Sequence, residues 1–224
     1  MKRLPEKDIE KFEIFYIRHA DTSGAPFDDR SKCDIDLSPL GEKQIELLAK
    51  RFEDKSFDAV FSSPLVRAVK TAAAVCEKLS GNPQIEIMPE LIENGTMPEY
   101  DGVNIRYLKR YYDNIVLCPD TVYGKNGRFT NNTDRKNDAR AKALIKYFRN
   151  RFPYGTKIAV FAHGSFGNHF IPQAVEMGHG NYILSINNTS VTKIKYTSDG
   201  KQRISFQNDF SHLRPLMENY EFDV

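Results

Sequence analysis

A buried strand that ends in an arginine and a histidine constrains the fold of this chain more than any other stretch. Residues 12–17 read Phe-Glu-Ile-Phe-Tyr-Ile, and Arg18 and His19 follow directly. Five of these six residues are apolar or aromatic, which predicts a strand covered on both faces. A guanidinium and an imidazole need partners when they are buried. Because the carboxyl ends of strands line the ligand crevice in open α/β sheets, we expect chemistry at this strand end.

Two further apolar runs end in a similar way. Residues 57–61 are followed by Arg67 in the first turn of the next predicted helix, and residues 156–162 are followed by His163. Strands that alternate with helices in right-handed crossovers place their ends on one edge of one sheet. The sequence therefore predicts an α/β fold in which these side chains meet those at the end of the first strand.

The helix that carries Arg67 is predicted from a serine and proline signal. Residues 62–64, Ser-Ser-Pro, favour a helix start, and the helix should run to about Leu79 and stop at Gly81. Backbone N–H groups and a guanidinium at one helix N-terminus attract phosphate. Ordinary alternatives stay open at this point, because Arg67 can extend from an exposed first turn and Arg-His pairs are also common on surfaces.

The remaining periodicity predicts further helices and strands. The helices are expected at residues 38–52, with Ser38 as N-cap and Pro39 in the first turn, and at residues 137–152. The strands are expected at residues 84–88, 182–186, 191–196 and 203–206, with a hairpin turn at residues 198–201 that contains Asp-Gly.

Regular periodicity fails over residues 94–136, apart from a helix-like piece at residues 104–115. The segment mixes tyrosines with arginines and lysines. So long an excursion within a compact domain is typically functional or mobile, and we interpret it as a lid inserted into one domain that spans residues 1–224. A solvated basic and aromatic helix without a role is the alternative.

Charge and hydropathy exclude several classes of protein. Lys plus Arg number 32 and Asp plus Glu 30, a balance too even to indicate nucleic acid or an anionic membrane as a partner. The first eleven residues lack the apolar core of a signal peptide, and no apolar run approaches the ~18 residues that span a membrane. Three cysteines without a Cys-x-x-Cys pair fit reduced thiols. We therefore expect a cytoplasmic protein.

Six short motifs, in this order along the chain, resemble the histidine phosphatase superfamily in its phosphoglycerate-mutase-like branch. They are residues 17–22 (IRHADT), 36–44 (DLSPLGEKQ), 61–72 (FSSPLVRAVKTA), 91–95 (LIENG), 161–164 (FAHG) and 188–191 (NTSV). The resemblance covers most of the chain apart from the expected lid. It implies a three-layer α/β/α sandwich with a mostly parallel central sheet.

The resemblance also implies a role for each motif residue. His19 would be the nucleophile that carries the phosphoryl group, and Glu93 would be the acid and base. The phosphate-binding residues would be Arg18, Arg67, Thr22 and His163, of which His163 also belongs to the catalytic set.

Physical reasons support these residue types. Two guanidiniums that stay protonated, and that can each bind two oxygens, suit a group with charge on three oxygens. An imidazole attacks only through an unprotonated nitrogen, so the other nitrogen of His19 should donate its proton to an acceptor that sets the tautomer. Glu93 can protonate the leaving alkoxide and then take a proton from water. Since Arg18, Arg67 and His163 supply charge stabilisation, we expect no metal and no cofactor. The other histidines lack the spacing of a zinc site and are expected to be structural or surface residues: His169, His179 and His212.

Departures from the family pattern bear on the substrate. Ala25 stands where mutase-like members usually carry an asparagine that touches the phosphate, and no tryptophan follows Glu93. Ala20, in place of the motif's glycine, adds only a methyl group. We therefore expect a metal-independent phosphatase that hydrolyses a small phosphorylated metabolite through a phosphohistidine. The alternatives are phosphoglycerate-mutase-type phosphoryl transfer and an inactive phosphate-binding regulatory module.

Overall fold

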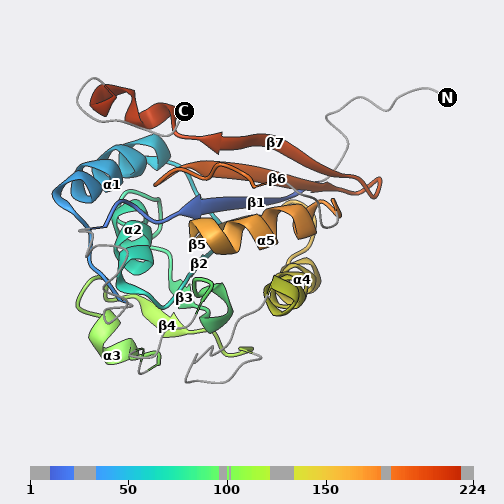
Figure 1. Ribbon diagram of the computed structural model, residues 1–224, viewed down its shortest axis with the longest axis horizontal. Coiled ribbons are helices and arrows are strands. Elements are labelled where there is room, and N and C mark those ends of the chain that lie inside the picture. The colour runs from blue at the N-terminus through green and yellow to red at the C-terminus, as the bar shows by residue number, and fades with distance from the viewer. Residues whose placement is uncertain are drawn as a thin grey trace.

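A central sheet organises the computed structural model, which describes residues 11–22, 34–95, 100, 102–121, 134–177 and 183–217. Seven strands of these residues lie in the order β4-β3-β2-β5-β1-β6-β7. The five strands from β4 to β1 run parallel to one another (Figure 1). Strand β6 pairs antiparallel with β1, and β7 pairs antiparallel with β6. Their bounds are β1 Lys11–Arg18, β2 Ala59–Ser62, β3 Ile85–Ile87, β4 Ile115–Leu117, β5 Lys157–Ala162, β6 Val191–Thr197 and β7 Gln202–Asp209.

Helices cover both faces of the sheet (Figure 1). They are α1 (Pro39–Phe52), α2 (Val66–Cys76), α3 (Ile105–Leu108), α4 (Asp134–Arg151) and α5 (Gly164–Ala174), with 3-10 helices η2 (Pro89–Leu91) and η3 (Ser211–Leu216). Strand β1 contributes to both layers, because Ile14 and Tyr16 pack in one core with α4 and α5 while Ile17 packs in the other with α1 and α2. The predicted strand with two buried faces and the α/β fold are confirmed.

Two local predictions from cap and turn residues are also confirmed. Ser38 Oγ accepts a hydrogen bond from Gly41 N at 2.9 Å, and Pro39 opens α1, where its missing N–H costs nothing. Gly200 has a φ of +84° in the turn between β6 and β7, a conformation that glycine adopts without strain.

The predicted start of α2 is wrong. The helix begins at Val66, and its N-cap is Leu65, whose side chain makes no capping hydrogen bond. The reason is that Ser63 Oγ lies 2.7 Å from His163 Nε2, a partner on a different strand end. Ser63, a residue type that favours a helix cap, therefore makes a tertiary contact with His163 instead.

The helix-like piece predicted over residues 104–115 is also wrong at its far end. Helix α3 stops at Leu108, and Ile115 begins strand β4, which pairs with β3 at the sheet edge. Ile115 is fully buried in this position. Part of the expected lid is therefore built into the sheet, because an Ile-Val-Leu run gains more from burial against β3 than from a solvated helix.

The strand expected over residues 182–186 does not form in residues 183–186, the part that the structure describes. Leu184 instead donates its N–H to Asn168 Oδ1 at 2.6 Å and accepts from Asn168 Nδ2 at 3.2 Å. A side-chain amide on α5 thus takes the place of a neighbouring strand.

Helix α4 begins at Asp134 rather than at the predicted residue 137. Within the described residues, every helix is too short or too polar to cross a membrane.

Candidate active site

Four of the predicted site residues, Arg18, His19, Arg67 and His163, meet at the carboxyl edge of three adjacent strands. Arg18 ends β1, His163 follows β5, and α2, which starts after β2, carries Arg67 in its first turn. Strands β1, β5 and β2 are parallel neighbours. Their ends therefore lie side by side, and the rings of His19 and His163 are 5.1 Å apart between centroids.

His19 is held in one tautomer by contacts on both ring nitrogens. Nδ1 lies 2.6 Å from the carbonyl oxygen of Ala20, which can only accept, so Nδ1 carries the proton. Arg67 Nε, which can only donate, lies 3.3 Å from Nε2. The lone pair of His19 is thus on Nε2 and faces the Arg67 guanidinium. This is the arrangement that the sequence predicts for a nucleophilic imidazole.

Both histidines of the site are kept neutral. Burial lowers the pKa of His19 well below its ordinary value, and the charges of Arg67 and Arg18 lower it further. Burial, Arg67 and His19 likewise lower the pKa of His163 well below its ordinary value. His163 is completely buried, with Nε2 2.7 Å from Ser63 Oγ. Tyr16 Oη donates to its carbonyl oxygen at 2.7 Å.

Arg18 extends along α5 beside a glycine. Its Nη1 donates to the carbonyl oxygen of Ile186 at 2.6 Å. A Cβ on Gly164 would lie 3.2 Å from Arg18 Nε and 3.3 Å from Cζ, so the missing side chain makes room for the guanidinium. The first residue of α5 therefore sets how closely Arg18 can approach the helix.

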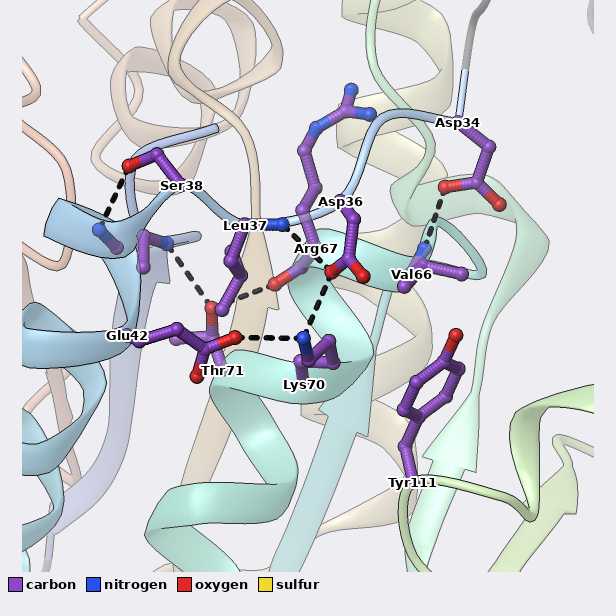
Figure 2. Close-up of polar contacts among 12 residues, drawn as sticks. Asp34, Asp36, Leu37, Ser38, Glu42, Val66, Arg67, Lys70, Thr71 and Tyr111 are labelled. Carbon is purple, nitrogen blue, oxygen red and sulfur yellow. Dashed lines mark hydrogen bonds and ion pairs between the residues drawn. The ribbon is translucent and has the colours of Figure 1, made fainter. Parts of the chain in front are cut away.

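Thr71 and the loop before α1 fix the position of Arg67 (Figure 2). Thr71 Oγ1 donates to the carbonyl oxygen of Arg67 at 2.7 Å and accepts from Ala20 N at 3.0 Å, which ties α2 to the residue after His19. Asp34 Oδ1 accepts from Val66 N at 2.7 Å and occupies the helix N-terminus that the sequence suggested for phosphate. Arg67 thus contributes its side chain to the site, whereas the N–H of Val66 at the helix start is already bound by Asp34.

Lys70 fastens the same loop to α2. Its Nζ lies 2.9 Å from Asp36 Oδ1 and 2.7 Å from Glu42 Oε1, so one ammonium bridges the loop and α1 (Figure 2). The pairs are largely exposed and contribute little individually to the free energy of unfolding. The pairs hold the loop and α1 against the part of α2 that carries Arg67, because Lys70 follows Arg67 by one helical turn.

Glu93 follows η2 and contacts the start of α5. Its Oε1 accepts from Phe166 N at 2.8 Å and Asn94 N at 2.9 Å, and Oε2 lies 3.4 Å from Ser165 N. The carboxylate thus sits on the N-terminal end of α5, which begins directly after His163. Glu93 and Arg18 line one cavity of about 230 Å³, whose other lining residues are Gly164, Ser165, Asn168, Leu184, Ser185, Ile186 and Asn187.

Thr22 is not brought to the other site residues by any contact in the described part of the chain. Its backbone pairs with Leu37 in an isolated antiparallel bridge, and its side chain is half-buried. Ala25 lies outside the described residues, as do His179 and parts of the expected lid, residues 96–99, 101 and 122–133.

The structure adds supporting residues that the sequence analysis did not single out. Asn188 Nδ2 donates to the carbonyl oxygen of His19 at 3.0 Å, and Thr189 N donates to that of Arg18 at 3.1 Å. Thr189 has a φ of +55°, a strained conformation for a threonine. His212, expected to be structural, lies 3.1 Å from Thr189 Oγ1. The motif at residues 188–191 was the only sequence signal for this support.

Potential metal ligands do not cluster in the described residues, where no group of three or more His, Cys, Asp or Glu side chains is arranged to hold an ion. The polar groups that converge on the site are two guanidiniums, two neutral imidazoles and one carboxylate. This set suits an anionic substrate and proton transfer.

Comparisons with known proteins identify relatives of this chain and structures with a similar fold. A curated relative, the putative phosphoserine phosphatase 2 of Hydrogenobacter thermophilus, is 22% identical over 208 residues, which are 91% of this chain and 98% of the relative. Among solved structures, phosphoserine phosphatase from Entamoeba histolytica in complex with phosphoserine has a TM-score of 0.59 and 20% identity, covering 90% of this chain and 99% of that one. Phosphoglycerate mutase from Bacillus anthracis has a TM-score of 0.63 and 20% identity, covering 93% and 98%.

The sequence profile of one family matches nearly the whole described fold. The description of that family is histidine phosphatase superfamily (branch 1), and the match covers residues 14–209, from β1 to the end of β7. All six motifs of the sequence analysis fall within it. This chain therefore belongs to branch 1 of the histidine phosphatase superfamily.

Proposed function

We propose that the chain is a metal-independent phosphatase that hydrolyses a small phosphomonoester through a phosphohistidine on His19. The observation that carries the proposal is the tautomer of His19. Its Nδ1 proton is donated to Ala20, and its Nε2 lone pair faces Arg67. A buried, neutral imidazole with its free lone pair beside a guanidinium is a nucleophile already aligned with the place where a phosphoryl group binds.

In the first step, His19 Nε2 attacks phosphorus and the bond from phosphorus to the ester oxygen breaks. Arg18 and Arg67 bind the phosphoryl oxygens, and His163 lies against His19 where it can donate to the same group. Glu93, as the carboxylic acid, gives its proton to the departing alkoxide. Arg67 exchanges its hydrogen bond with His19 for bonds to phosphate as the substrate enters.

In the second step, water attacks the phosphohistidine and its proton passes to the Glu93 carboxylate. The bond between phosphorus and Nε2 breaks, His19 recovers its lone pair, and inorganic phosphate leaves. The contacts from Phe166 N and Asn94 N hold the Glu93 carboxylate at the cavity that Arg18 also lines. One carboxyl group can therefore serve both steps in turn.

Phosphoserine and other small hydroxy-acid phosphates are the first substrates to test. The curated relative carries the name phosphoserine phosphatase, and a solved relative holds phosphoserine. The cavity beside Arg18 and Glu93 measures about 230 Å³, which suits a leaving group of a few heavy atoms. We propose that this cavity receives the alcohol portion of the substrate.

The segment at about residues 94–136 is proposed to contribute substrate preference, apart from β4, which belongs to the sheet. Lys70 Nζ lies 5.9 Å from the centroid of the Tyr111 ring, and Tyr111 Oη lies 3.1 Å from Tyr107 Oη. Tyr111 therefore lies close to the start of α2, where Arg67 is (Figure 2). Replacing Tyr111, Arg106 or Arg110 should raise KM for the preferred metabolite and leave p-nitrophenyl phosphate hydrolysis nearly unchanged.

We propose a cytoplasmic location because the two cysteines that the structure describes are free thiols. Cys76 and Cys118 are buried free cysteines, and burial raises the pKa of Cys76 to about 12. Unreactive reduced thiols are typical of reducing compartments. Cell fractionation with an antibody to the native protein tests this assignment.

The function is tested by assaying the purified chain against a panel of phosphorylated metabolites, with phosphate release and isomer formation measured in the same samples. We expect phosphate release that EDTA leaves intact. Loss of most activity in EDTA, restored by Mg²⁺ or Zn²⁺, would contradict the metal-independent mechanism. Isomerisation of phosphoglycerate faster than phosphate release would favour the mutase alternative, and failure to form phosphoenzyme with any substrate would favour the inactive module.

A further inference from the structure

A buried arginine that no site motif includes lies behind the proposed acid. Arg140 belongs to α4, is 2% exposed, and is among the largest fully buried side chains of the described residues. A buried guanidinium is costly unless its N–H groups are hydrogen-bonded. An apolar residue at this position of α4 would fill the core without that cost. The contacts of Arg140 therefore indicate what its charge is for.

Two of these contacts bracket Glu93 along the chain. Arg140 Nη1 donates to the carbonyl oxygen of Ile92 at 2.8 Å, and Nη2 donates to Asn94 Oδ1 at 3.0 Å. Nη2 also donates to Asn137 Oδ1 at 2.9 Å, one turn earlier on α4. The guanidinium thus fixes the main chain before Glu93 and the side chain after it, from a helix that begins about 40 residues later.

A third contact reaches the helix on which the Glu93 carboxylate rests. Arg140 Cζ lies 4.1 Å from the centroid of the Phe166 ring, a close stacking contact between a guanidinium and an aromatic face. Phe166 N is the donor that lies 2.8 Å from Glu93 Oε1. The second donor to Oε1 is Asn94 N. Both N–H groups that hold this oxygen therefore belong to residues that Arg140 contacts.

We propose that Arg140 is a positioning residue for Glu93, an inference that rests on the proposed role of Glu93 as general acid and base. It acts through Ile92, Asn94 and Phe166, and it aims the carboxyl group at the leaving oxygen. A general acid must lie within hydrogen-bond reach of that oxygen, so a shift of about 1 Å removes much of its contribution. None of the contacts described above joins Arg140 to Arg18 or Arg67, the two arginines proposed to bind the phosphoryl oxygens.

This separation gives Arg140 a kinetic signature that a merely structural residue lacks. Alkyl phosphates have a poor leaving group and need the acid, whereas p-nitrophenyl phosphate leaves as a stable anion and needs it little. We expect Arg140→Met to lower kcat/KM for an alkyl phosphomonoester at least about 10-fold more than for p-nitrophenyl phosphate. Arg140→Lys, which keeps the charge and one donor direction, should recover part of the difference.

The matched control is Arg151→Met on the same helix. Arg151 pairs with Glu86 at 2.5 Å and lies over the Phe61 ring at 5.4 Å, so it too is a stabilising arginine with an aromatic contact. It contacts none of the residues next to Glu93. We expect Arg151→Met to lower the Tm and to change the two kcat/KM values by the same factor.

Glu93→Gln and the double variant Glu93→Gln with Arg140→Met complete the experiment. If Arg140 acts through Glu93, its substitution should slow the alkyl ester no further once Glu93 has lost its acid. Additive losses in the double variant, or an Arg140→Met enzyme that loses both substrates equally, would overturn the inference while the proposed function stands. A Glu93→Gln variant that slows both esters by the same factor would remove Glu93 from the acid role, and the inference for Arg140 would be overturned with it.

Asn94→Ala provides the test if Arg140→Met fails to fold. It removes the Oδ1 atom that accepts from Arg140 and keeps the Asn94 N–H that binds Glu93 Oε1. We expect a smaller loss with the same preference for the aryl ester. Equal rates for the variant and the native chain on both esters would contradict the positioning role.

Discussion

Arg67 Nε lies 3.3 Å from His19 Nε2 and donates to it, although the two residues are 48 positions apart. The contact occupies the lone pair that would attack phosphorus and places a permanent positive charge beside the imidazole. Burial is the main cause of the lowered pKa of His19, and the positive charge of Arg67 lowers this pKa further because it opposes protonation of the ring. One side chain would therefore both mark the proposed phosphate position and keep the proposed nucleophile neutral.

Removing that charge should move the acid limb of the pH profile. In Arg67→Gln the pKa of His19 should rise towards its ordinary value, so kcat/KM should begin to fall at a higher pH than in the native chain. Arg67→Lys should keep the position of the limb but lower kcat/KM at least about 10-fold, because an ammonium cannot bind two phosphate oxygens in one plane. An acid limb that stays in place in Arg67→Gln would contradict the electrostatic role.

His19 should carry the phosphoryl group. Rapid acid-free quenching during turnover should trap a base-stable, acid-labile phosphoenzyme in the native chain, and His19→Ala should form none and lose at least about 10³-fold in kcat. The matched control is His169→Gln, because His169 pairs with Asp138 at 2.8 Å between α5 and α4. Turnover by His19→Ala at the native rate would exclude the mechanism.

Glu93→Gln should separate substrates by leaving group. The amide keeps an acceptor for the N–H groups of Asn94 and Phe166 but cannot give a proton to an alkoxide. We expect a loss of about 10²-fold for an alkyl phosphate and a much smaller loss for p-nitrophenyl phosphate. Steady-state kinetics with both esters measures the difference, and equal losses would remove Glu93 from the acid role.

The free energy of unfolding should fall as the solution becomes acidic below pH about 6.5. The pKa values of His19 and His163 are lowered in the folded chain, so only the unfolded chain binds these protons as the pH drops through the ordinary histidine value. His212, whose pKa is lowered to about 4, adds to the same trend. Each such histidine contributes a slope of about 1.4 kcal/mol per pH unit, present between the unfolded and folded pKa values.

Urea unfolding at several pH values measures this slope. In His163→Gln this slope should be smaller by the contribution of about one proton, because glutamine keeps a polar group near Ser63 but does not titrate. A slope that is the same in the native chain and in His163→Gln would show that His163 takes up its proton in the folded state.

Gly164→Ala should damage the site without damaging the fold. The added Cβ would lie 3.2 Å from Arg18 Nε and 3.3 Å from Cζ, so the guanidinium has to move by a few tenths of an ångström. Alanine at the start of α5 is compatible with a helix, so the Tm should stay close to that of the native chain. We expect kcat/KM to fall by about 10-fold, as misplacement of a binding group implies. Native kcat/KM in a folded Gly164→Ala enzyme would show that Arg18 can relax freely.

The amino-acid sequence by itself determined the central strands of the sheet and which side chains follow them. Residues 12–17 and 156–162 are predominantly apolar runs, so burial on both faces is favourable for them. The groups that follow them, Arg18, His19 and His163, then share one edge by the handedness of parallel crossovers. Ser38 and the turn at Gly200 are equally local, because a cap and a left-handed turn depend on neighbours along the chain.

Contacts between distant residues decided the rest. The tautomer of His19 depends on Arg67, and the position of the Glu93 carboxylate depends on the start of α5. Ser63 binds His163 rather than capping α2, because a hydroxyl takes the partner that folding brings to it. No sequence motif includes Arg140, and the role proposed for it follows only from its buried contacts on either side of Glu93. Periodicity reports burial and not partners, so tertiary structure alone could assign them.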